Sequence, residues 1–152
     1  MTIGQPMTIS RKALCMLYGV VAVVALVGTW GNNIAYLDLG FWGANVQFWT
    51  DTLANPASRS ITVDIFWLGF AVLVWMVLEA RRLGLRGVWL YVVFGLLVAI
   101  SVTVPLFLIH RERTLAARES SPTAGRLSGA DVAGLIALGV GFFVYTTIAL
   151  RY

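Results

Sequence analysis

Four long apolar stretches interrupt the polar positions along the chain, and each has the length of a membrane-spanning helix. They cover residues 13–30, 60–78, 87–109 and 132–150, and only the second contains a charged residue, Asp64. A helix needs about 20 mostly apolar residues to cross the hydrocarbon core of a bilayer. The runs are continuous rather than alternating, which favours helices over a barrel. The pattern therefore predicts an all-α membrane protein with four transmembrane helices.

The connection between the first two stretches carries a helical signal of its own. Apolar residues recur in it on one face of a helix. These residues are Trp42, Val46, Trp49 and Leu53. Because aromatic side chains favour the boundary between lipid and water, we expect a short interfacial helix here. An aromatic belt is the preferred interpretation, and a lid over a cavity is the alternative.

Two pairs of residues mark the ends of the second stretch. Asn55 is a good N-cap, and Pro56 suits a first helical turn because its missing N–H would be unpaired there. At the other end, Glu79 and Arg82 are three residues apart and within reach of an intrahelical ion pair. We interpret these four residues as structural ends of a helix that begins near Pro56.

The composition supports a membrane protein. The chain has 152 residues, of which 59% are hydrophobic and 12% charged, and its mean hydropathy is +0.84. A soluble domain of this size could not hide that much apolar surface. Its one cysteine and one histidine exclude an intramolecular disulfide and a multi-histidine metal or haem site within one chain. We expect the lipid bilayer as a partner, and no cofactor, metal or nucleic acid.

The basic residues bear on orientation, because cytoplasmic segments are enriched in lysine and arginine. Four spans would place Arg11, Lys12, Arg81, Arg82, Arg86 and Arg151 on one side of the membrane. They would place Arg59, Arg111, Arg113, Arg118 and Arg126 on the other. Cationic residues in the very short loop at 81–86 and the pair Arg11 and Lys12 before the first stretch decide between the two sides. We therefore predict a cell-membrane protein with both termini cytoplasmic.

The predicted parts are a cytoplasmic N-terminus (1–12), a three-helix portion (13–109), an extracytoplasmic loop (110–128), and a fourth transmembrane helix with the C-terminus (129–152).

Asp64 is the main candidate for function. It lies eight residues after Pro56, or about 12 Å along the helix axis. A carboxylate at such a depth is costly and usually faces a partner or a cavity. Ser101 and Thr103 are expected at a similar depth on the third stretch, and Pro105 is expected to kink it. We therefore predict a ligand-binding site of Asp64, Ser101, Thr103 and Pro105, with an ordinary hydrogen-bonded contact between helices as the alternative.

Helix packing and catalysis are less clearly indicated. Gly95, Ala99 and Thr103 would share one face of a continuous third helix, which favours close packing within the bundle over homodimerisation. No catalytic motif is present, so no catalytic residue is predicted.

Three functions remain open. The preferred one is an accessory or lipophilic-ligand-binding protein, with a membrane-protein partner or homodimer possible. The others are a small proton-coupled transporter acting as a dimer and an intramembrane enzyme acting on a lipid or isoprenoid.

The order of several short motifs resembles one family. The motifs are Leu53-Ala54-Asn55-Pro56, Asp64, Glu79-Ala80-Arg81-Arg82-Leu83-Gly84, Trp89, Tyr91 and Val104-Pro105-Leu106-Phe107-Leu108. Together they resemble the small bacterial membrane proteins grouped as domain of unknown function 2834, over residues 15–113. The resemblance implies a multi-pass inner-membrane protein. It supplies no established biochemical role, cofactor or catalytic residue.

Overall fold

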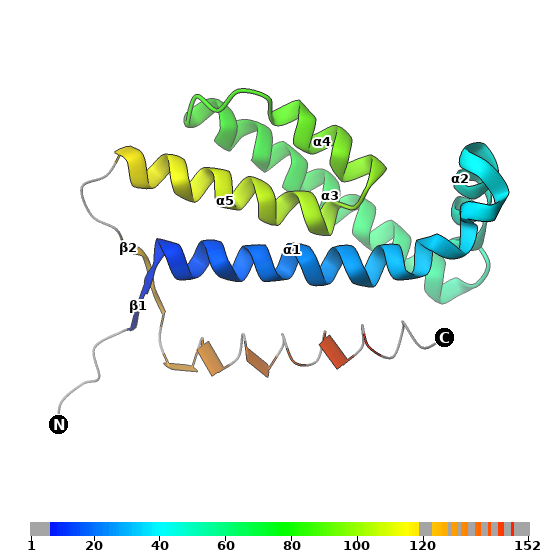
Figure 1. Ribbon diagram of the computed structural model, residues 1–152, viewed down its shortest axis with the longest axis horizontal. Helices are drawn as coiled ribbons and strands as arrows, with labels where there is room; N and C mark the ends of the chain where they lie inside the picture. The colour runs from blue at the N-terminus through cyan, green and yellow to red at the C-terminus, as the bar shows by residue number, and fades with distance from the viewer. Residues whose placement is uncertain are drawn as a thin grey trace.

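The computed structural model describes residues 7–118 and 123–127, and beyond them only the helical positions 129–130, 132–133, 136–137, 140, 143–144 and 147. The elements are β1 (Met7–Ser10), α1 (Arg11–Asn33), the 3-10 helix η1 (Ile34–Leu39), α2 (Gly40–Asp51), α3 (Pro56–Arg82), α4 (Val88–Leu97), α5 (Ile100–Arg118) and β2 (Thr123–Leu127). The fold is therefore predominantly helical, with one short two-stranded sheet (Figure 1). Of the predicted fourth helix at 132–150, only isolated positions are described.

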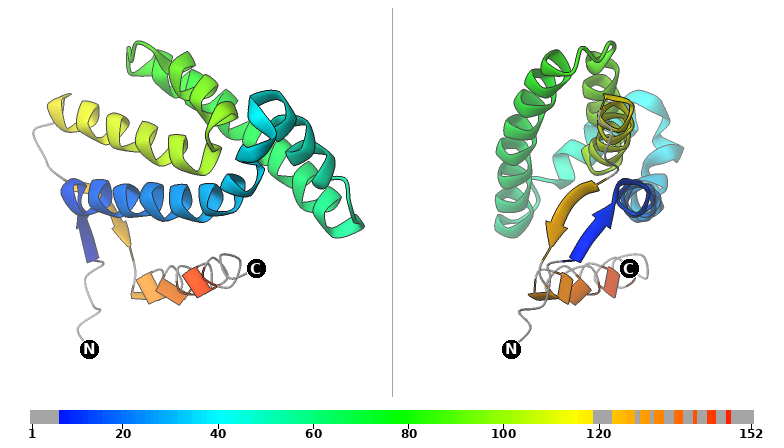
Figure 2. Two further views of the ribbon diagram at one scale, coloured as in Figure 1. Left: turned by 45° about the vertical axis from the view of Figure 1, so that its right-hand side comes forward. Right: turned by 90° about the vertical axis from the view of Figure 1, so that its left-hand side faces the viewer.

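α5 is the element that joins the helices together. It packs antiparallel along α1 on one side and along α4 on the other, and α3 contacts both α4 and α5 (Figures 1 and 2). The N-terminal end of α3 diverges from this group towards η1 and α2 (Figure 2). The buried hydrophobic cluster lies at the opposite end of α3, where the chain passes into α4. Its residues are Met76, Ala80, Leu83, Leu85, Val88 and Phe107.

The two short strands bring the segment after α5 back to the start of α1. β1 and β2 are antiparallel, with Met7 opposite Leu127 and Ser10 opposite Thr123. Ser10 also caps α1, because its hydroxyl accepts a hydrogen bond from the backbone N–H of Ala13 at 3.1 Å. The start of α1 and the segment 123–127 therefore share one end of the molecule.

The predicted start of the second apolar helix is confirmed. The Asn55 side chain accepts a hydrogen bond from the Ser58 backbone N–H at 2.9 Å, and the Ser58 hydroxyl accepts one from the Asn55 backbone N–H at 3.3 Å. This reciprocal capping box satisfies two backbone donors, and Pro56 occupies the first turn. At the other end α3 stops at Arg82, and Gly84 follows with a φ of +60°, a conformation that glycine adopts at little cost.

The third apolar stretch forms two helices, so the prediction of one continuous helix at 87–109 is wrong. α4 ends at Leu97, and α5 begins at Ile100 and runs back along α4 (Figure 1). No proline or glycine stands at the turn, so tertiary packing rather than a local helix breaker produces it. A Cβ added at Gly95 on α4 would lie only 2.9 Å from the Thr103 hydroxyl oxygen on α5, which shows how closely the two helices of this hairpin pack.

The same rearrangement bears on the neighbouring predictions. Pro105, which was expected to kink the third stretch, lies inside α5, and the reversal of the chain comes before it, at residues 98–99. The charged segment from residue 110 was expected to be a loop, but α5 continues through it to Arg118. The predicted helix between the first two stretches is confirmed as α2, and its interfacial position stays a prediction.

Two helical segments of the described chain are long and apolar enough to cross a membrane. They are Arg11–Asp51 and Pro56–Arg82, and only 6% and 11% of their most apolar windows are buried. The core helix of a soluble protein would be mostly buried, so this exposure agrees with membrane association. α4 is apolar but shorter than a membrane-spanning helix.

Candidate functional site

Asp64 lies on the N-terminal half of α3 with its side chain exposed. Among the residues that the structure describes, its carboxylate takes part in no hydrogen bond or ion pair. A shallow, open hollow lined by Val63, Phe66, Trp67 and Phe70 lies on the same part of α3. Trp67 follows Asp64 by three residues, so the two side chains are neighbours on the helix surface. The carboxylate thus stands beside an aromatic surface.

The other predicted members of this site lie on the α4–α5 hairpin. Thr103 and Pro105 are buried, whereas Ser101 is exposed. The Thr103 hydroxyl is oriented towards its own helix, with the carbonyl oxygens of Ala99 and Ile100 both at 3.4 Å. The described side chains make no hydrogen bond between Asp64 and these three residues. The structure therefore does not assemble the four residues through polar contacts, and their binding of a ligand stays a prediction.

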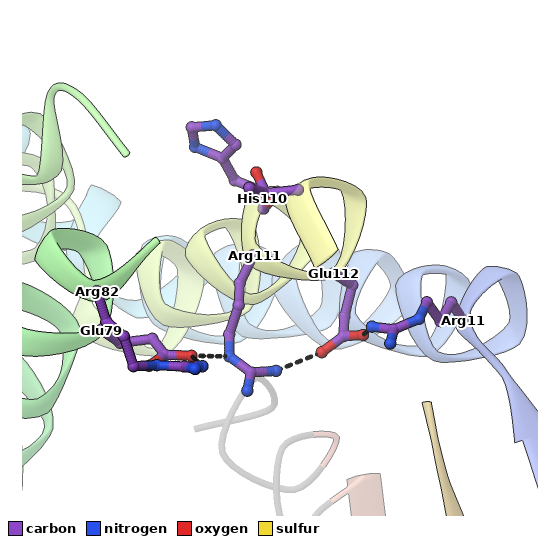
Figure 3. A network of polar contacts seen from close by, with 7 residues as sticks. Arg11, Glu79, Arg82, His110, Arg111 and Glu112 are labelled. Atoms are coloured by element: carbon purple, nitrogen blue, oxygen red, sulfur yellow. Dashed lines mark hydrogen bonds and ion pairs between the residues drawn. The ribbon is translucent and has the colours of Figure 1, made fainter. Parts of the chain in front are cut away.

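A second polar cluster lies at the far end of the bundle, where five charged side chains from three helices alternate in sign (Figure 3). Arg11 on α1 donates to Glu112 on α5 at 2.7 Å, and Arg111 donates to the other Glu112 oxygen at 2.5 Å. Arg111 also donates from Nε to Glu79 on α3 at 2.7 Å. Arg82 completes the series with two hydrogen bonds to Glu79, at 2.6 and 2.7 Å. We call these five residues the ion-pair chain.

Burial makes the ion-pair chain structurally important. The side chains of Glu79 and Glu112 are only 8% and 4% exposed, and that of Arg11 is 10% exposed. Removing one partner of a buried pair leaves an uncompensated charge, which is strongly destabilising. Because its members come from α1, α3 and α5, the ion-pair chain fixes the relative positions of these helices. The predicted contact between Glu79 and Arg82 is confirmed as part of it.

Glu79 lies just beyond the apolar stretch 60–78, and its ion pairs hold it in the charged form. The two hydrogen bonds donated by Arg82 lower the pKa of Glu79 from 4.5 to about 2, and Arg111 adds to this, whereas desolvation opposes it. Glu79 is therefore a carboxylate at neutral pH and a poor proton donor. This chemistry suits a fixed structural charge rather than an acid–base catalyst.

Sequence reasoning missed most of the ion-pair chain. Arg11 was interpreted only as a topology signal, and Arg111 was placed in an outer loop together with Glu112. Their charges at the edges of apolar stretches were visible, but their pairing depends on the reversal at residues 98–99. Without that reversal, the chain would carry Glu112 away from Arg11, to the opposite end of the bundle.

One further polar contact lies next to the ion-pair chain. The Tyr91 hydroxyl on α4 and His110 Nδ1 on α5 are 3.2 Å apart, which ties the two arms of the hairpin together. Within the part of the chain that the structure describes, no group of three histidine, cysteine, aspartate or glutamate side chains is placed to hold a metal ion. The two candidate sites are therefore the exposed Asp64 carboxylate on α3 and the buried ion-pair chain.

Comparison with known proteins gives one match. No curated protein and no solved structure matches the chain. The family described as protein of unknown function DUF2834 matches residues 17–113, which include most of α1, all of α2 to α4 and most of α5. This match covers more than half of the sequence and agrees with the resemblance drawn from the short motifs. The chain therefore belongs to the DUF2834 family.

Proposed function

We propose that this chain is an integral membrane protein that binds a lipophilic ligand bearing a positive charge at the Asp64 face of α3. The observation that carries the proposal is an exposed carboxylate on a long apolar helix, beside exposed aromatic side chains. A charged group in a bilayer is costly unless it meets a partner. A carboxylate next to aromatic faces suits a cation, which both groups attract.

The membrane placement has support of its own. α3 is about 40 Å long, and its apolar face is almost entirely exposed, so it has the length and surface of a spanning helix. α1 is about 34 Å long and similar in character. The cationic residues near the start of α1 and the end of α3 support a cytoplasmic position for those ends, because cytoplasmic segments are enriched in lysine and arginine. The prediction for the C-terminus concerns residues outside the described chain.

The Asp64 face also suits the two roles closest to ligand binding. As an accessory protein, the chain would present Asp64 to a basic or hydrogen-bonding group on a partner helix. As a proton-coupled transporter, it would bind and release a proton at the exposed carboxylate. Such sites usually lie near the midplane of the membrane, whereas Asp64 lies only about 12 Å from the start of α3. An enzymatic role has no comparable support, because no other described titratable group forms a hydrogen bond or ion pair with Asp64.

The test is direct binding of tetraphenylphosphonium, a lipophilic cation, to the purified chain in mild detergent. We expect Asp64→Asn to weaken binding at least tenfold, because the variant loses the charge but keeps the shape of the side chain. Asp38→Asn is the matched control, since Asp38 is an exposed acid outside the apolar stretches. Equal binding by all three proteins would refute the proposed site.

Native mass spectrometry of the same proteins separates the related roles. A small molecule that copurifies with the wild type but not with Asp64→Asn supports ligand binding, and its mass gives its chemical class. A dimer that forms in the wild type but is lost in Asp64→Asn would favour a role of this face in binding a second copy of the chain. Identical spectra for wild type and variant, together with equal cation binding, would leave Asp64 without a role in recognition.

A further inference from the structure

The α4–α5 hairpin is too short to cross a bilayer. α4 has 10 residues and is about 15 Å long. The apolar part of α5, from Ile100 to the first residue of the ion-pair chain at Arg111, covers 11 residue steps, or about 16 Å. The hydrocarbon core is about 30 Å thick. The apolar part of each arm is therefore long enough to reach only about half-way, and the chain returns to the end of the bundle from which α4 starts (Figure 1).

The tip of the hairpin has the contacts that such a turn needs inside a membrane. Non-helical backbone at membrane depth is tolerated where protein surrounds it and its polar groups are bonded. The Trp30 indole of α1 donates a hydrogen bond to the Val98 carbonyl at 3.3 Å. On the other side, Ile100 lies against α3, where a Cβ added at Gly69 would be 3.0 Å from its Cδ1 atom. The tip is thus held between the two long apolar helices.

Both arms end at the level of the ion-pair chain. Arg11 pairs with Glu112, and Arg111 pairs with Glu79, so the start of α1, the end of α3 and the second half of α5 lie together. The loop at 83–87 and the sheet of β1 and β2 are at this end as well (Figure 1). A re-entrant hairpin therefore places residues 110–118 on the same side of the membrane as residue 11.

This arrangement concentrates the positive charge of the chain. Of its 11 lysine and arginine residues, all but Arg59 and Arg151 belong to segments at this end, and Arg151 lies outside the described residues. The acids Glu79 and Glu112 are buried in ion pairs, so the exposed, described side chains that carry charge here are cations. They are Lys12, Arg81, Arg82, Arg86 and Arg113, and we call them the basic rim. At the opposite end, η1 and α2 expose Asp38 and Asp51.

We propose that α4 and α5 form a re-entrant hairpin, and that the basic rim which it completes is a docking surface for the headgroups of anionic phospholipids in the cytoplasmic leaflet. That leaflet carries negative charge and attracts basic residues next to spanning helices. Arginine suits phosphate because its planar guanidinium offers several donors. Trp89, which is 59% exposed at the start of α4, lies at the depth where aromatic anchors favour the interface.

The first experiment tests the hairpin by labelling single cysteines in a Cys15→Ser background. Arg86→Cys and Arg113→Cys mark the two ends of the hairpin, and Ala54→Cys marks the opposite end of the bundle. With a membrane-impermeant maleimide, we expect the first two to react in inverted vesicles and the third in intact cells. Labelling of Arg113→Cys together with Ala54→Cys in intact cells would overturn the inference, since the segment 88–109 would then cross the bilayer.

The second experiment tests the docking surface with detergent-solubilised protein titrated with phosphatidylglycerol or phosphatidylcholine. We expect a preference for phosphatidylglycerol that falls about fivefold for Arg86→Gln and at least tenfold when Arg81→Gln and Arg113→Gln are added. Arg59→Gln, at the other end, should leave the preference unchanged. An excess of free inorganic phosphate should compete only weakly. No preference in the wild type, or equal losses in Arg59→Gln and Arg86→Gln, would refute the docking surface.

This inference rests on the membrane placement proposed above but not on the Asp64 site. Alkaline carbonate extraction distinguishes the two failures. Release of the chain from membranes by carbonate would overturn the membrane placement and the hairpin together. Retention of the chain, with Arg113→Cys labelled from the outer side, would overturn the hairpin alone.

Discussion

The close approach of Gly95 and Thr103 provides a sharp test of the hairpin. A Cβ at Gly95 would meet the Thr103 hydroxyl oxygen at 2.9 Å, a separation that requires something to shift. Overfilling a packed site costs about 1–3 kcal/mol. Replacing glycine by alanine inside a helix recovers about 1 kcal/mol of propensity. We therefore expect Gly95→Ala to be less stable than the wild type by up to about 2 kcal/mol.

The control and the double variant isolate the contact. Gly19→Ala, on α1, places its methyl group where nothing lies within 4 Å, so it should gain the propensity term alone. Thr103→Ala removes the hydroxyl, whose own hydrogen bonds are long at 3.4 Å, at a cost of about 1 kcal/mol or less. In Gly95→Ala/Thr103→Ala the methyl group has room, so the two changes should couple by about 0.5–3 kcal/mol.

Thermal unfolding in one detergent gives the four free energies of this cycle. For a chain of this size the melting temperature changes by about 2–4 °C for each kcal/mol of stability. The melting temperature of Gly95→Ala should therefore lie roughly 2–12 °C below that of Gly19→Ala. Adding Thr103→Ala to Gly95→Ala should restore much of the lost stability. In a continuous helix the two residues would be about 12 Å apart along the axis. Additive effects, within about 0.5 kcal/mol, would therefore refute the hairpin.

Two further predictions concern α3. Asn55→Ala removes the capping side chain and should lower the free energy of unfolding by about 1 kcal/mol, whereas Asn55→Asp, which keeps an acceptor, should not; parallel melting curves check this. Because the pKa of Glu79 is lower in the folded chain, its ionised carboxylate stabilises the fold at pH values above the ordinary pKa of 4.5. This contribution should disappear as the pH falls from about 4.5 to about 2. Melting temperatures across this range should converge with those of Glu79→Gln, and a constant gap between the two proteins would contradict the assignment.

Features that depend on local sequence could be predicted, and features that depend on distant contacts could not. The start of α3 follows from Asn55 and Pro56, and its charged end follows from the spacing of Glu79 and Arg82, because caps and i,i+3 pairs involve neighbouring residues. The apolar stretch 87–109 gives no such local signal for its reversal. Hydropathy counts apolar residues and does not distinguish one helix from two shorter helices that fold onto each other.

The same limit explains why charge alone did not settle the orientation. When the stretch 87–109 is taken as one crossing, Arg111, Arg113, Arg118 and Arg126 oppose the other cationic segments, and the two sides nearly balance. When it is taken as a hairpin, the same residues join Arg11 and its neighbours, and the balance disappears. The charge pattern was therefore informative, but its meaning depended on a tertiary feature that only the packing of α4 against α5 reveals.

The ion-pair chain and the hairpin also depend on each other energetically. Burying Glu112 and Arg11 is costly, and their mutual attraction offsets that cost only when both are held in good geometry. The hairpin supplies that geometry, because it returns α5 to the end of the bundle where α1 begins. In a chain that crossed the bilayer at 88–109, Glu112 and Arg11 would lie on opposite sides and neither could be buried with its partner. The buried pair at 2.7 Å therefore favours the re-entrant arrangement over a third crossing.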